Sequence, residues 1–199
     1  MTFEEALKSN QSVFEINLDS DTLSALSAYY SLLVRWNARL HLVAPCSPEE
    51  FATRHVLESL ALLKHLPANA KIADIGSGAG LPIIPCLIAR PDLHATLIES
   101  SHKKSVFLRE ALTAVARNAA IISRPFEEVA TLDVDFVTCR ALDQFTEKVP
   151  DIIRWAPTGS TRLFFGGETL REKLSKETEV YKIPLSEKRF LFVNHGLHG

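Results

Sequence analysis

The first third of the chain carries its apolar residues at the spacing of an amphipathic helix. Over residues 21–43 they recur every three or four positions, which predicts a helix with one buried face. The residues on that face are Leu23, Leu26, Tyr30, Leu33, Asn37 and Leu40. Residues 19–21 offer capping side chains, and a second helix is predicted over residues 48–66, beginning at Pro48. We therefore interpret residues 1–67 as a helical segment.

From residue 68 onward, short apolar segments alternate with helical ones. The predicted strands cover residues 71–75, 94–99, 119–123, 134–139, 161–165, 179–183 and 189–194. Helices are predicted between the first three strands, over residues 81–90 and 102–117. This alternation is typical of a mostly parallel sheet with helices on both faces. The later strands show no helical pattern between them, so we predict an antiparallel edge there and assign residues 68–199 to an α/β core behind an N-terminal helical extension.

Composition places the chain among ordinary globular proteins. Hydrophobic residues make up 46% and charged residues 23% of its 199 positions. No apolar run reaches the roughly 18 residues needed to span a bilayer, and the acidic first residues do not resemble a signal peptide, so we expect a cytoplasmic location. The net charge of −2 argues weakly against nucleic acid as the main partner, because such proteins are commonly basic.

The cysteines and histidines suggest no metal site. Cys46, Cys86 and Cys139 lie far apart and form no C-x-x-C pair, which argues against both a disulfide framework and a zinc site. The seven histidines are equally scattered. We interpret the cysteines as buried thiols, because a free cysteine packs as a small hydrophobic residue.

A glycine-rich turn follows the first predicted strand. Gly76, Gly78 and Gly80 come directly after residues 71–75, in a chain with only eight glycines. Ligands of doubly wound folds bind at the carboxyl ends of the strands, and glycine permits both positive φ and a close approach of the ligand to the backbone. Asp74, two residues before the first glycine, adds a negative charge. We therefore predict a ligand site at this turn.

Two classes of ligand compete for that site. The dinucleotide fingerprint G-x-G-x-x-G needs a third glycine at residue 81, which is Leu81. The observed G-x-G-x-G, preceded by Asp74, resembles the first motif of the class I methyltransferases, which bind S-adenosylmethionine. This cofactor carries an ammonium and a sulfonium group but no phosphate, so an acidic residue suits it. Glu99, at the end of the next strand, can accept hydrogen bonds from ribose hydroxyls in either class, so the glycine spacing is what favours methyl transfer.

Five segments in order make a more specific resemblance. They are "YYSLLVRWNARLHLV", "RHVLESL", "DIGSGAGLPIIP", "LIESSHKKSVFLRE" and "VTCRAL". Their order and spacing resemble the glucose-inhibited division protein B family, the small-subunit ribosomal RNA guanine-N7 methyltransferases. The resemblance covers nearly the whole chain. It implies a seven-stranded class I methyltransferase core, S-adenosylmethionine as cofactor, and methylation of a guanine N7 in 16S ribosomal RNA, conventional position 527, within the small ribosomal subunit or its precursor.

The resemblance also implies a set of site residues. The expected cofactor-binding residues are Asp74, Gly76, Gly78, Gly80, Leu81, Glu99, Phe126, Glu127 and Arg140. Arg140 is in addition the expected catalytic residue. The expected RNA-binding residues are Asn37, Arg54, His55 and Arg124. Neither a metal nor a membrane partner is expected, and the protein is expected to act as a monomer.

The chain departs from the family pattern at several positions. Ile83 stands where the family usually has glycine, and His41 replaces a customary asparagine. The segment "SRPFEEV" is one residue longer than the usual pattern, which affects the assignment of Phe126. Gly166 stands where many members carry a lysine. If that lysine holds RNA or polarises the base, this protein is expected to be slower or to use another cation.

The chemistry of guanine N7 limits what the site must do. N7 carries an in-plane lone pair and no proton, so no general base is needed and catalysis rests on positioning. The product base is cationic, so Arg140 is expected to donate to O6, to a phosphate or to the cofactor; its alternative role is an ion pair with a core carboxylate. Further candidates for phosphate contacts are Lys103, Lys104, Arg109, Arg117 and Arg124.

Two other functions stay open at this point. An NAD-linked oxidoreductase would need the missing third glycine and a separate substrate site. A non-catalytic ribosome-binding module that kept the methyltransferase fold is favoured by Ile83 and by the missing lysine at Gly166. Binding of the cofactor without turnover would identify that module.

Overall fold

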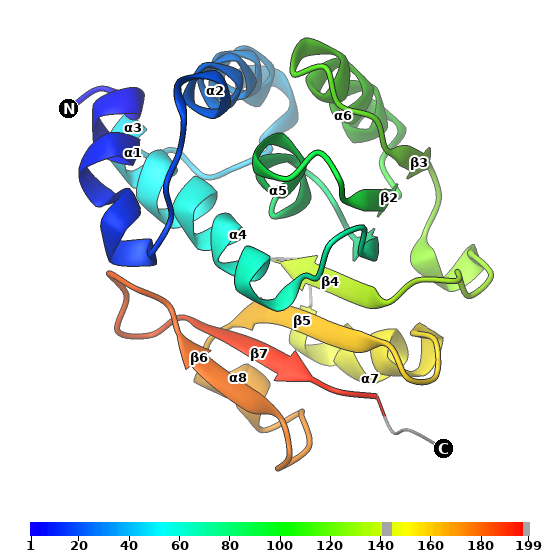
Figure 1. Ribbon diagram of the computed structural model, residues 1–199. Helices are drawn as coiled ribbons and strands as arrows, with labels where there is room; N and C mark the ends of the chain where they lie inside the picture. The colour runs from blue at the N-terminus through cyan, green and yellow to red at the C-terminus, as the bar shows by residue number, and fades with distance from the viewer. Residues whose placement is uncertain (141–144, 197–199) are drawn as a thin grey trace.

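The structure, a computed structural model, describes residues 1–140 and 145–196 and is built around a sheet between two layers of helices (Figure 1). Within the described residues the sheet has seven strands in the order β3-β2-β1-β4-β5-β7-β6. They are β1 Lys71–Ile75, β2 His94–Ile98, β3 Ala120–Ile122, β4 Phe136–Arg140, β5 Thr161–Gly166, β6 Glu179–Lys182 and β7 Phe190–Asn194. Neighbouring strands from β3 to β5 are parallel, whereas β7 is antiparallel to β5 and to β6. The predicted parallel sheet with an antiparallel edge is therefore confirmed.

The helices before β1 cover one face of the sheet together with α5 and α6 (Figure 1). These elements are α1 Phe3–Asn10, a 3-10 turn Gln11–Phe14, α2 Ser20–Leu40, α3 Pro48–Glu50, π-helical turns Phe51–Leu57, α4 Glu58–Leu60, a 3-10 turn Ala61–His65, α5 Ile83–Ala89 and α6 His102–Ala114. Their apolar side chains form one hydrophobic cluster with Leu163 and Phe165 of β5 and with Leu191 and Val193 of β7. The helical segment is therefore packed into the core, and its boundary at residue 67 stays a prediction.

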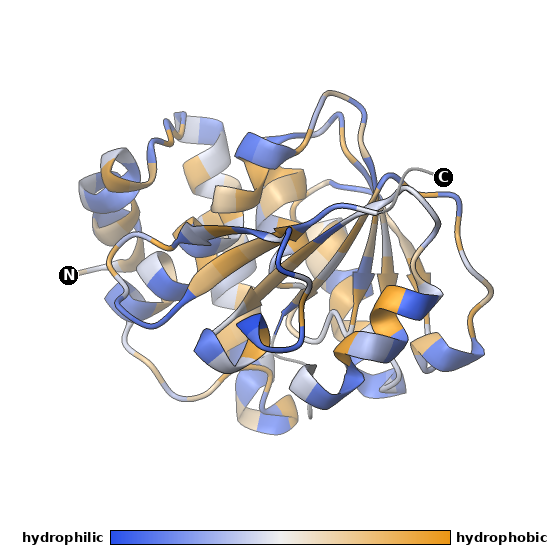
Figure 2. Cartoon of the chain, turned by 90° about the horizontal axis from the view of Figure 1, so that it is seen from below, coloured by the Kyte–Doolittle hydropathy of each residue, from blue (hydrophilic) through white to orange (hydrophobic). Residues whose placement is uncertain are grey.

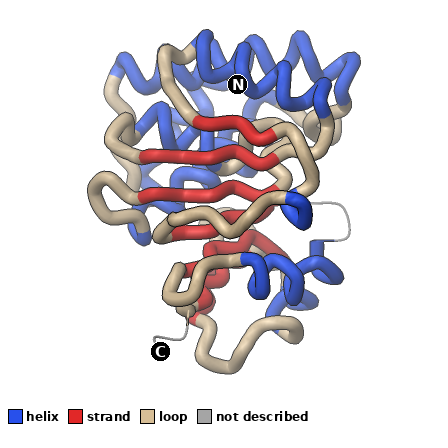
Figure 3. The backbone as a smooth tube through the Cα atoms, turned by 90° about the vertical axis from the view of Figure 1, so that its right-hand side faces the viewer, coloured by secondary structure: helices blue, strands red, loops and turns tan. Residues whose placement is uncertain are grey.

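The other face is covered by α7 Phe145–Trp155, α8 Glu168–Arg171 and a 3-10 turn Phe126–Glu128. Phe164 of β5 packs on this face, whereas its neighbours Leu163 and Phe165 pack on the opposite face of the sheet. This alternation is the two-residue period of a strand. Figure 2 shows apolar residues concentrated along the strands, and Figure 3 shows the strands as a row with helices on either side. The prediction that no helix separates the later strands is wrong twice. Helix α7 separates β4 from β5, and its Pro150 interrupts the sequence pattern; the four-residue α8 separates β5 from β6.

Two helix starts follow the predicted chemistry. The side chain of Asp19 accepts a hydrogen bond from the Thr22 N–H (2.8 Å) and caps α2. Pro48 occupies the first turn of α3, which is capped by Ser47. Both signals were readable in the sequence because capping is a local interaction.

Helix α2 is anchored to the glycine turn by a buried tyrosine. The sequence pattern placed Tyr30 on the buried face, but the fully buried residue is Tyr29. The Tyr29 hydroxyl donates a hydrogen bond to the Ala79 carbonyl (2.6 Å), a partner fifty residues away. Tyr30 is half-buried and stacks on Phe3, with ring centroids 4.4 Å apart.

Residues 1–140 and 145–196 carry no membrane-spanning helix and no metal-binding cluster. No helix there is long and apolar enough to cross a membrane. In the same ranges, no group of three or more His, Cys, Asp or Glu side chains is arranged to hold a metal ion. Cys86 and Cys139 are buried, Cys46 is half-buried, and no disulfide joins these three described residues.

Candidate active site

The glycine turn lies at the edge of the sheet where the parallel strands end. Strand β1 ends at Ile75, and the three glycines after it all have positive φ, 68° at Gly76, 51° at Gly78 and 81° at Gly80. A Cβ atom on Gly80 would lie 2.4 Å from a side-chain carbon of Ile84. The predicted need for glycine is therefore confirmed at the backbone level.

Two adjoining cavities flank this turn and share Gly76 and Ser100. The larger has a volume of about 590 Å³. It is lined by the glycine turn, by Arg140, by Arg189 in the loop before β7, and by three residues of the helical segment, Arg54, His55 and Glu58. The smaller, about 370 Å³, is lined by Arg124, Phe126, Glu127, Glu128 and Lys148, among others. The arrangement suits an elongated ligand that crosses the turn with one end in each cavity.

Glu99 follows β2 and fixes the turn. Its two carboxylate oxygens accept backbone hydrogen bonds, one from the Gly78 N–H (2.8 Å) and one from the Ser101 N–H (2.7 Å). The residue is 5% exposed and lines the larger cavity. Each carboxylate oxygen has a second lone pair, so Glu99 can still accept hydrogen bonds from a ligand.

Asp74 lies beneath the turn rather than on a cavity wall. It is fully buried, and one oxygen accepts a hydrogen bond from the Thr138 hydroxyl (2.7 Å). The other oxygen has no hydrogen-bond partner. Burial raises the pKa of this carboxyl to about 7. A cation near the turn would lower this pKa and favour the ionised carboxylate. Asp74 can therefore act on the cofactor through its charge, and the direct contact expected of it stays a prediction.

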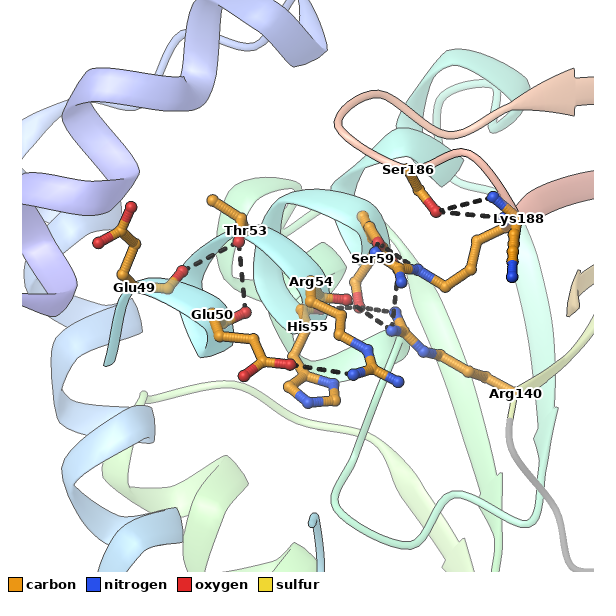
Figure 4. A network of polar contacts seen from close by, with 11 residues as sticks. Glu49, Glu50, Thr53, Arg54, His55, Ser59, Arg140, Ser186 and Lys188 are labelled. Carbon is orange, nitrogen blue, oxygen red and sulfur yellow. Dashed lines mark hydrogen bonds and ion pairs between the residues drawn. The ribbon is translucent and has the colours of Figure 1, made fainter. Parts of the chain in front are cut away.

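Arg140 ends β4 and contacts the helical segment (Figure 4). Its guanidinium donates to the Ser59 hydroxyl (3.3 Å), to the Arg54 carbonyl (2.6 Å) and to the Glu58 carboxylate (3.2 Å). It also lies over the Phe165 ring, 5.2 Å from the centroid. The alternative role for Arg140, an ion pair with a core carboxylate, is thus present, on a side chain that also lines the larger cavity.

His55 and Arg54 lie in the π-helical turns at the mouth of the larger cavity, and π-helical turns occur often at functional sites. Burial, with Arg140, Arg54 and a third arginine nearby, lowers the pKa of His55 to about 3, so the imidazole is neutral at ordinary pH. Its Nδ1 is buried without a partner. Arg54 is exposed and pairs with Glu50 (3.0 Å).

Asn37 shapes the cavity mouth through the backbone. Its amide donates to the Val43 carbonyl (3.0 Å) and accepts from the Val43 N–H (2.9 Å). Leu42, Val43 and Ala44 line the larger cavity. The RNA contact expected of Asn37 stays a prediction. In the structure, Asn37 fixes the loop that contains Val43 through these two hydrogen bonds.

The predicted contacts at the far end of the cofactor come together in the smaller cavity. Phe126 and Glu127 line it, and so does Arg124, which was expected to bind RNA. Glu127 pairs with Lys148 (2.9 Å), whose ammonium also lies 5.7 Å from the Phe126 ring centroid. An apolar ring beside a carboxylate is a suitable surface for a base.

The structure separates the predicted phosphate-binding cations. Lys104 lines the larger cavity and Arg124 the smaller one. Arg117 instead donates to the Leu87 carbonyl (2.8 Å) and to a neighbouring one, and Arg109 to the Ser123 hydroxyl (3.2 Å). Arg109 and Arg117 therefore have structural partners away from both cavities.

Sequence reasoning missed three residues that build the site: Tyr29, Glu58 and Arg189. Glu58 gave a signal, because it is a carboxylate inside the apolar run "VLESLALL". Its side chain is 2% exposed and pairs with two distant arginines, Arg140 at the end of β4 and Arg189 in the loop before β7. Arg189 gave none, since a basic residue in the loop before a strand is ordinary.

Comparison with known proteins identifies the family. The family model described as "GidB: rRNA small subunit methyltransferase G" matches residues 22–196. The chain belongs to the GidB family. Proteins named Ribosomal RNA small subunit methyltransferase G include one from Xanthomonas campestris pv. campestris (strain B100), 43% identical over 129 residues, which are 64% of this chain and 60% of the relative. Another, from Halorhodospira halophila, is 35% identical over 87% of this chain and 83% of the relative. The chain thus matches less than two thirds of the Xanthomonas proteins' length.

Solved structures support the same fold for this GidB protein. An RNA methyltransferase from Salinibacter ruber in complex with S-adenosyl-L-homocysteine has a TM-score of 0.56 at 17% identity, covering 79% of this chain and 95% of its own. A SAM dependent methyltransferase from Aquifex aeolicus has a TM-score of 0.57 at 12% identity, covering 76% and 94%. At these identities the likeness concerns the fold alone, and it confirms the predicted class I methyltransferase architecture.

The departures from the GidB pattern have local explanations. Ile83 is fully buried at the start of α5. His41 ends α2 with a left-handed φ of 47°, a conformation that asparagine and histidine both adopt more readily than most residues. A Cβ atom on Gly166 would lie 2.5 Å from Leu170 Cδ2, so a lysine there requires Leu170 to move.

Proposed function

We propose that this GidB protein transfers a methyl group from S-adenosylmethionine to N7 of a guanine in 16S ribosomal RNA, at conventional position 527, within the small ribosomal subunit or its precursor. The observation that carries the proposal is the glycine turn, with its three positive φ angles, between two cavities that share Gly76 and Ser100. Membership of the GidB family supplies the substrate class.

The residues present suit this cofactor. Its adenine end fits the smaller cavity beside Phe126, and its ribose hydroxyls fit the open lone pairs of Glu99. The buried carboxylate of Asp74 beneath the turn favours the cofactor's ammonium through charge rather than through contact. When bound, S-adenosylmethionine supplies the electrophilic methyl group. The alternative dinucleotide would require glycine in place of Leu81, which is 7% exposed and part of the hydrophobic cluster.

The protein's own contribution is positioning and charge balance. N7 needs no base to remove a proton, and the lowered pKa of His55, about 3, makes its imidazole a weak base. Holding the two reactants in line is worth roughly 7–11 kcal/mol in favourable cases. The product base is cationic, and the pairing of Arg140 with Glu58 limits the repulsion that an unpaired guanidinium would exert there.

RNA must enter as an unpaired base. The major groove of A-form RNA, where N7 lies, is too narrow to be read by side chains, so the guanine is looped or splayed out. Arg54, Lys104 and Arg189 line the larger cavity and are suited to the flanking phosphates, with Arg124 beside the smaller one. The net charge of −2 favours a structured subunit over naked RNA as the substrate.

The test is methyl transfer from tritiated S-adenosylmethionine to unmodified small ribosomal subunits, with the labelled nucleoside identified by mass spectrometry. Label in a single N7-methylguanosine is the expected result. Binding of the cofactor without any transfer would instead support the non-catalytic ribosome-binding module. A spectral titration with NADH that shows stoichiometric binding would support the oxidoreductase.

A further inference from the structure

One buried carboxylate joins two arginines that lie far apart in the chain, Arg140 at the end of β4 and Arg189 just before β7. Glu58 accepts from Arg140 through one oxygen (3.2 Å) and from Arg189 through the other (2.7 Å and 2.5 Å). Its side chain is 2% exposed, so both ion pairs are almost fully screened from water on its side. A buried carboxylate is costly unless its partners and hydrogen bonds are well placed.

The two arginines occupy different depths of the larger cavity. Arg140 is 11% exposed at its side chain and lies over the Phe165 ring, whereas Arg189 is 37% exposed. All three charged residues line this cavity. Figure 4 shows Arg140 reaching the helix that carries Ser59, with Ser186 and Lys188 of the loop before β7 on the same side. Arg140 is thus the more deeply buried of the two arginines, and Arg189 belongs to the loop before β7.

Neither arginine has another carboxylate in the hydrogen bonds and ion pairs found over the described residues. The nearby carboxylate of Glu50 is already paired with Arg54. Loss of the Glu58 charge would therefore leave two guanidinium groups uncompensated beside the place where the methylated base becomes cationic.

We propose that Glu58 is a positioning residue of the methyl-transfer site, which holds Arg140 toward the cofactor and Arg189 toward the RNA through its two carboxylate oxygens. This inference rests on the proposed function, and it adds a residue that connects the cofactor-binding part of the site with the RNA-binding part. Sequence position alone does not bring the three residues together, because Glu58 lies in α4, Arg140 in β4 and Arg189 in the loop before β7.

The experiment compares the wild type with Glu58→Gln, Glu58→Asp, Arg189→Gln and a matched control, Asp92→Asn. The Asp92 carboxylate also binds an arginine, Arg90, through two hydrogen bonds of 2.7 Å, but it lines neither cavity. For each protein we would measure the unfolding temperature, the dissociation constant of S-adenosylhomocysteine by calorimetry, and kcat and KM with unmodified small subunits.

Glu58→Gln is expected to weaken S-adenosylhomocysteine binding about tenfold and to lower kcat/KM for subunits by about 30-fold or more. Arg189→Gln is expected to change only the subunit side, with kcat/KM about fivefold lower and unchanged S-adenosylhomocysteine binding. Glu58→Asp keeps the charge but cannot reach both arginines, so partial rescue is expected. Asp92→Asn is expected to unfold at a lower temperature with wild-type kinetics.

The double variant Glu58→Gln/Arg189→Gln separates positioning from a general loss of stability. If the two residues act as a unit, its kcat/KM is no lower than that of Glu58→Gln alone. Strictly multiplicative losses, or wild-type kinetics in Glu58→Gln, would overturn the inference. If Glu58→Gln does not fold, unchanged kinetics in both Glu58→Asp and Arg189→Gln would overturn it. A wild type that binds no cofactor or methylates nothing contradicts the proposed function instead.

Discussion

Replacing Asp74 by asparagine tests the charge buried beneath the glycine turn. Burial raises the pKa of this carboxyl from its ordinary 3.8 to about 7, so the folded protein binds the proton more tightly than the unfolded chain does. The stabilising contribution of the protonated Asp74 is therefore fully present below the pKa of the unfolded chain. It is lost as the pH rises from that value to the pKa of the folded protein. The loss is about 4 kcal/mol in total, because each pKa unit corresponds to about 1.4 kcal/mol. The asparagine variant has no such loss.

The measurement is the free energy of unfolding from urea titrations, without cofactor, at pH 5 and pH 8. The Asp74→Asn variant keeps an acceptor for Thr138 but puts an amide where the second oxygen has no partner, a cost of about 1–3 kcal/mol that does not depend on pH. The difference in unfolding free energy between variant and wild type is expected to shift by about 2–3 kcal/mol in favour of the variant between the two pH values. A constant difference would refute the buried-charge reasoning.

The same variant has an expected effect on binding. The cofactor's ammonium favours the ionised carboxylate, so the wild type is expected to bind S-adenosylhomocysteine more tightly as the pH rises from 5.5 to 8. The Asp74→Asn variant is expected to bind more weakly, without that pH dependence. Calorimetry at the two pH values checks this, and parallel pH profiles would contradict a role for the Asp74 charge.

Three further substitutions test the turn and the smaller cavity. Tyr29→Phe removes the hydrogen bond to the Ala79 carbonyl, so the free energy of unfolding in urea should fall by about 1–2 kcal/mol and S-adenosylhomocysteine should bind more weakly. Unchanged binding would show that this contact of α2 does not support the cofactor site. Gly80→Ala puts a Cβ atom 2.4 Å from Ile84 at positive φ, so about 1–3 kcal/mol of stability and most cofactor affinity should be lost in the same assays. Phe126→Leu keeps apolar bulk but loses the ring, and calorimetry should show S-adenosylhomocysteine binding about fivefold weaker; equal binding would exclude base stacking there.

The parts of the site that were predictable depend on short segments. The glycine turn and Glu99 follow consecutive strands of one βαβ unit, so their meeting at one sheet edge follows from the order of elements. The cap at Asp19 is equally local. The strand alternation that predicted the parallel sheet works for the same reason, since period and chain order are both visible in the sequence.

The parts that were not predictable depend on distant partners. Tyr29 rather than Tyr30 is buried because of a carbonyl fifty residues away, and the face pattern alone cannot choose between adjacent tyrosines. Glu58 is stabilised in the interior by Arg140 and Arg189, which lie 82 and 131 residues away. Helix α7 was missed because Pro150 interrupts its pattern, although tertiary packing stabilises the helix.

The shared hydrophobic cluster has a consequence for synthesis. Leu7 of α1 and Leu26 of α2 belong to the same cluster as Leu191 and Val193 of β7. These helices are translated well before β7, so this core cannot close until β7 has also left the ribosome. The early helices must keep an apolar face exposed meanwhile. A nascent chain stalled before β7 is therefore expected to be more easily digested by protease than the released protein, in the helical segment as well as in the sheet.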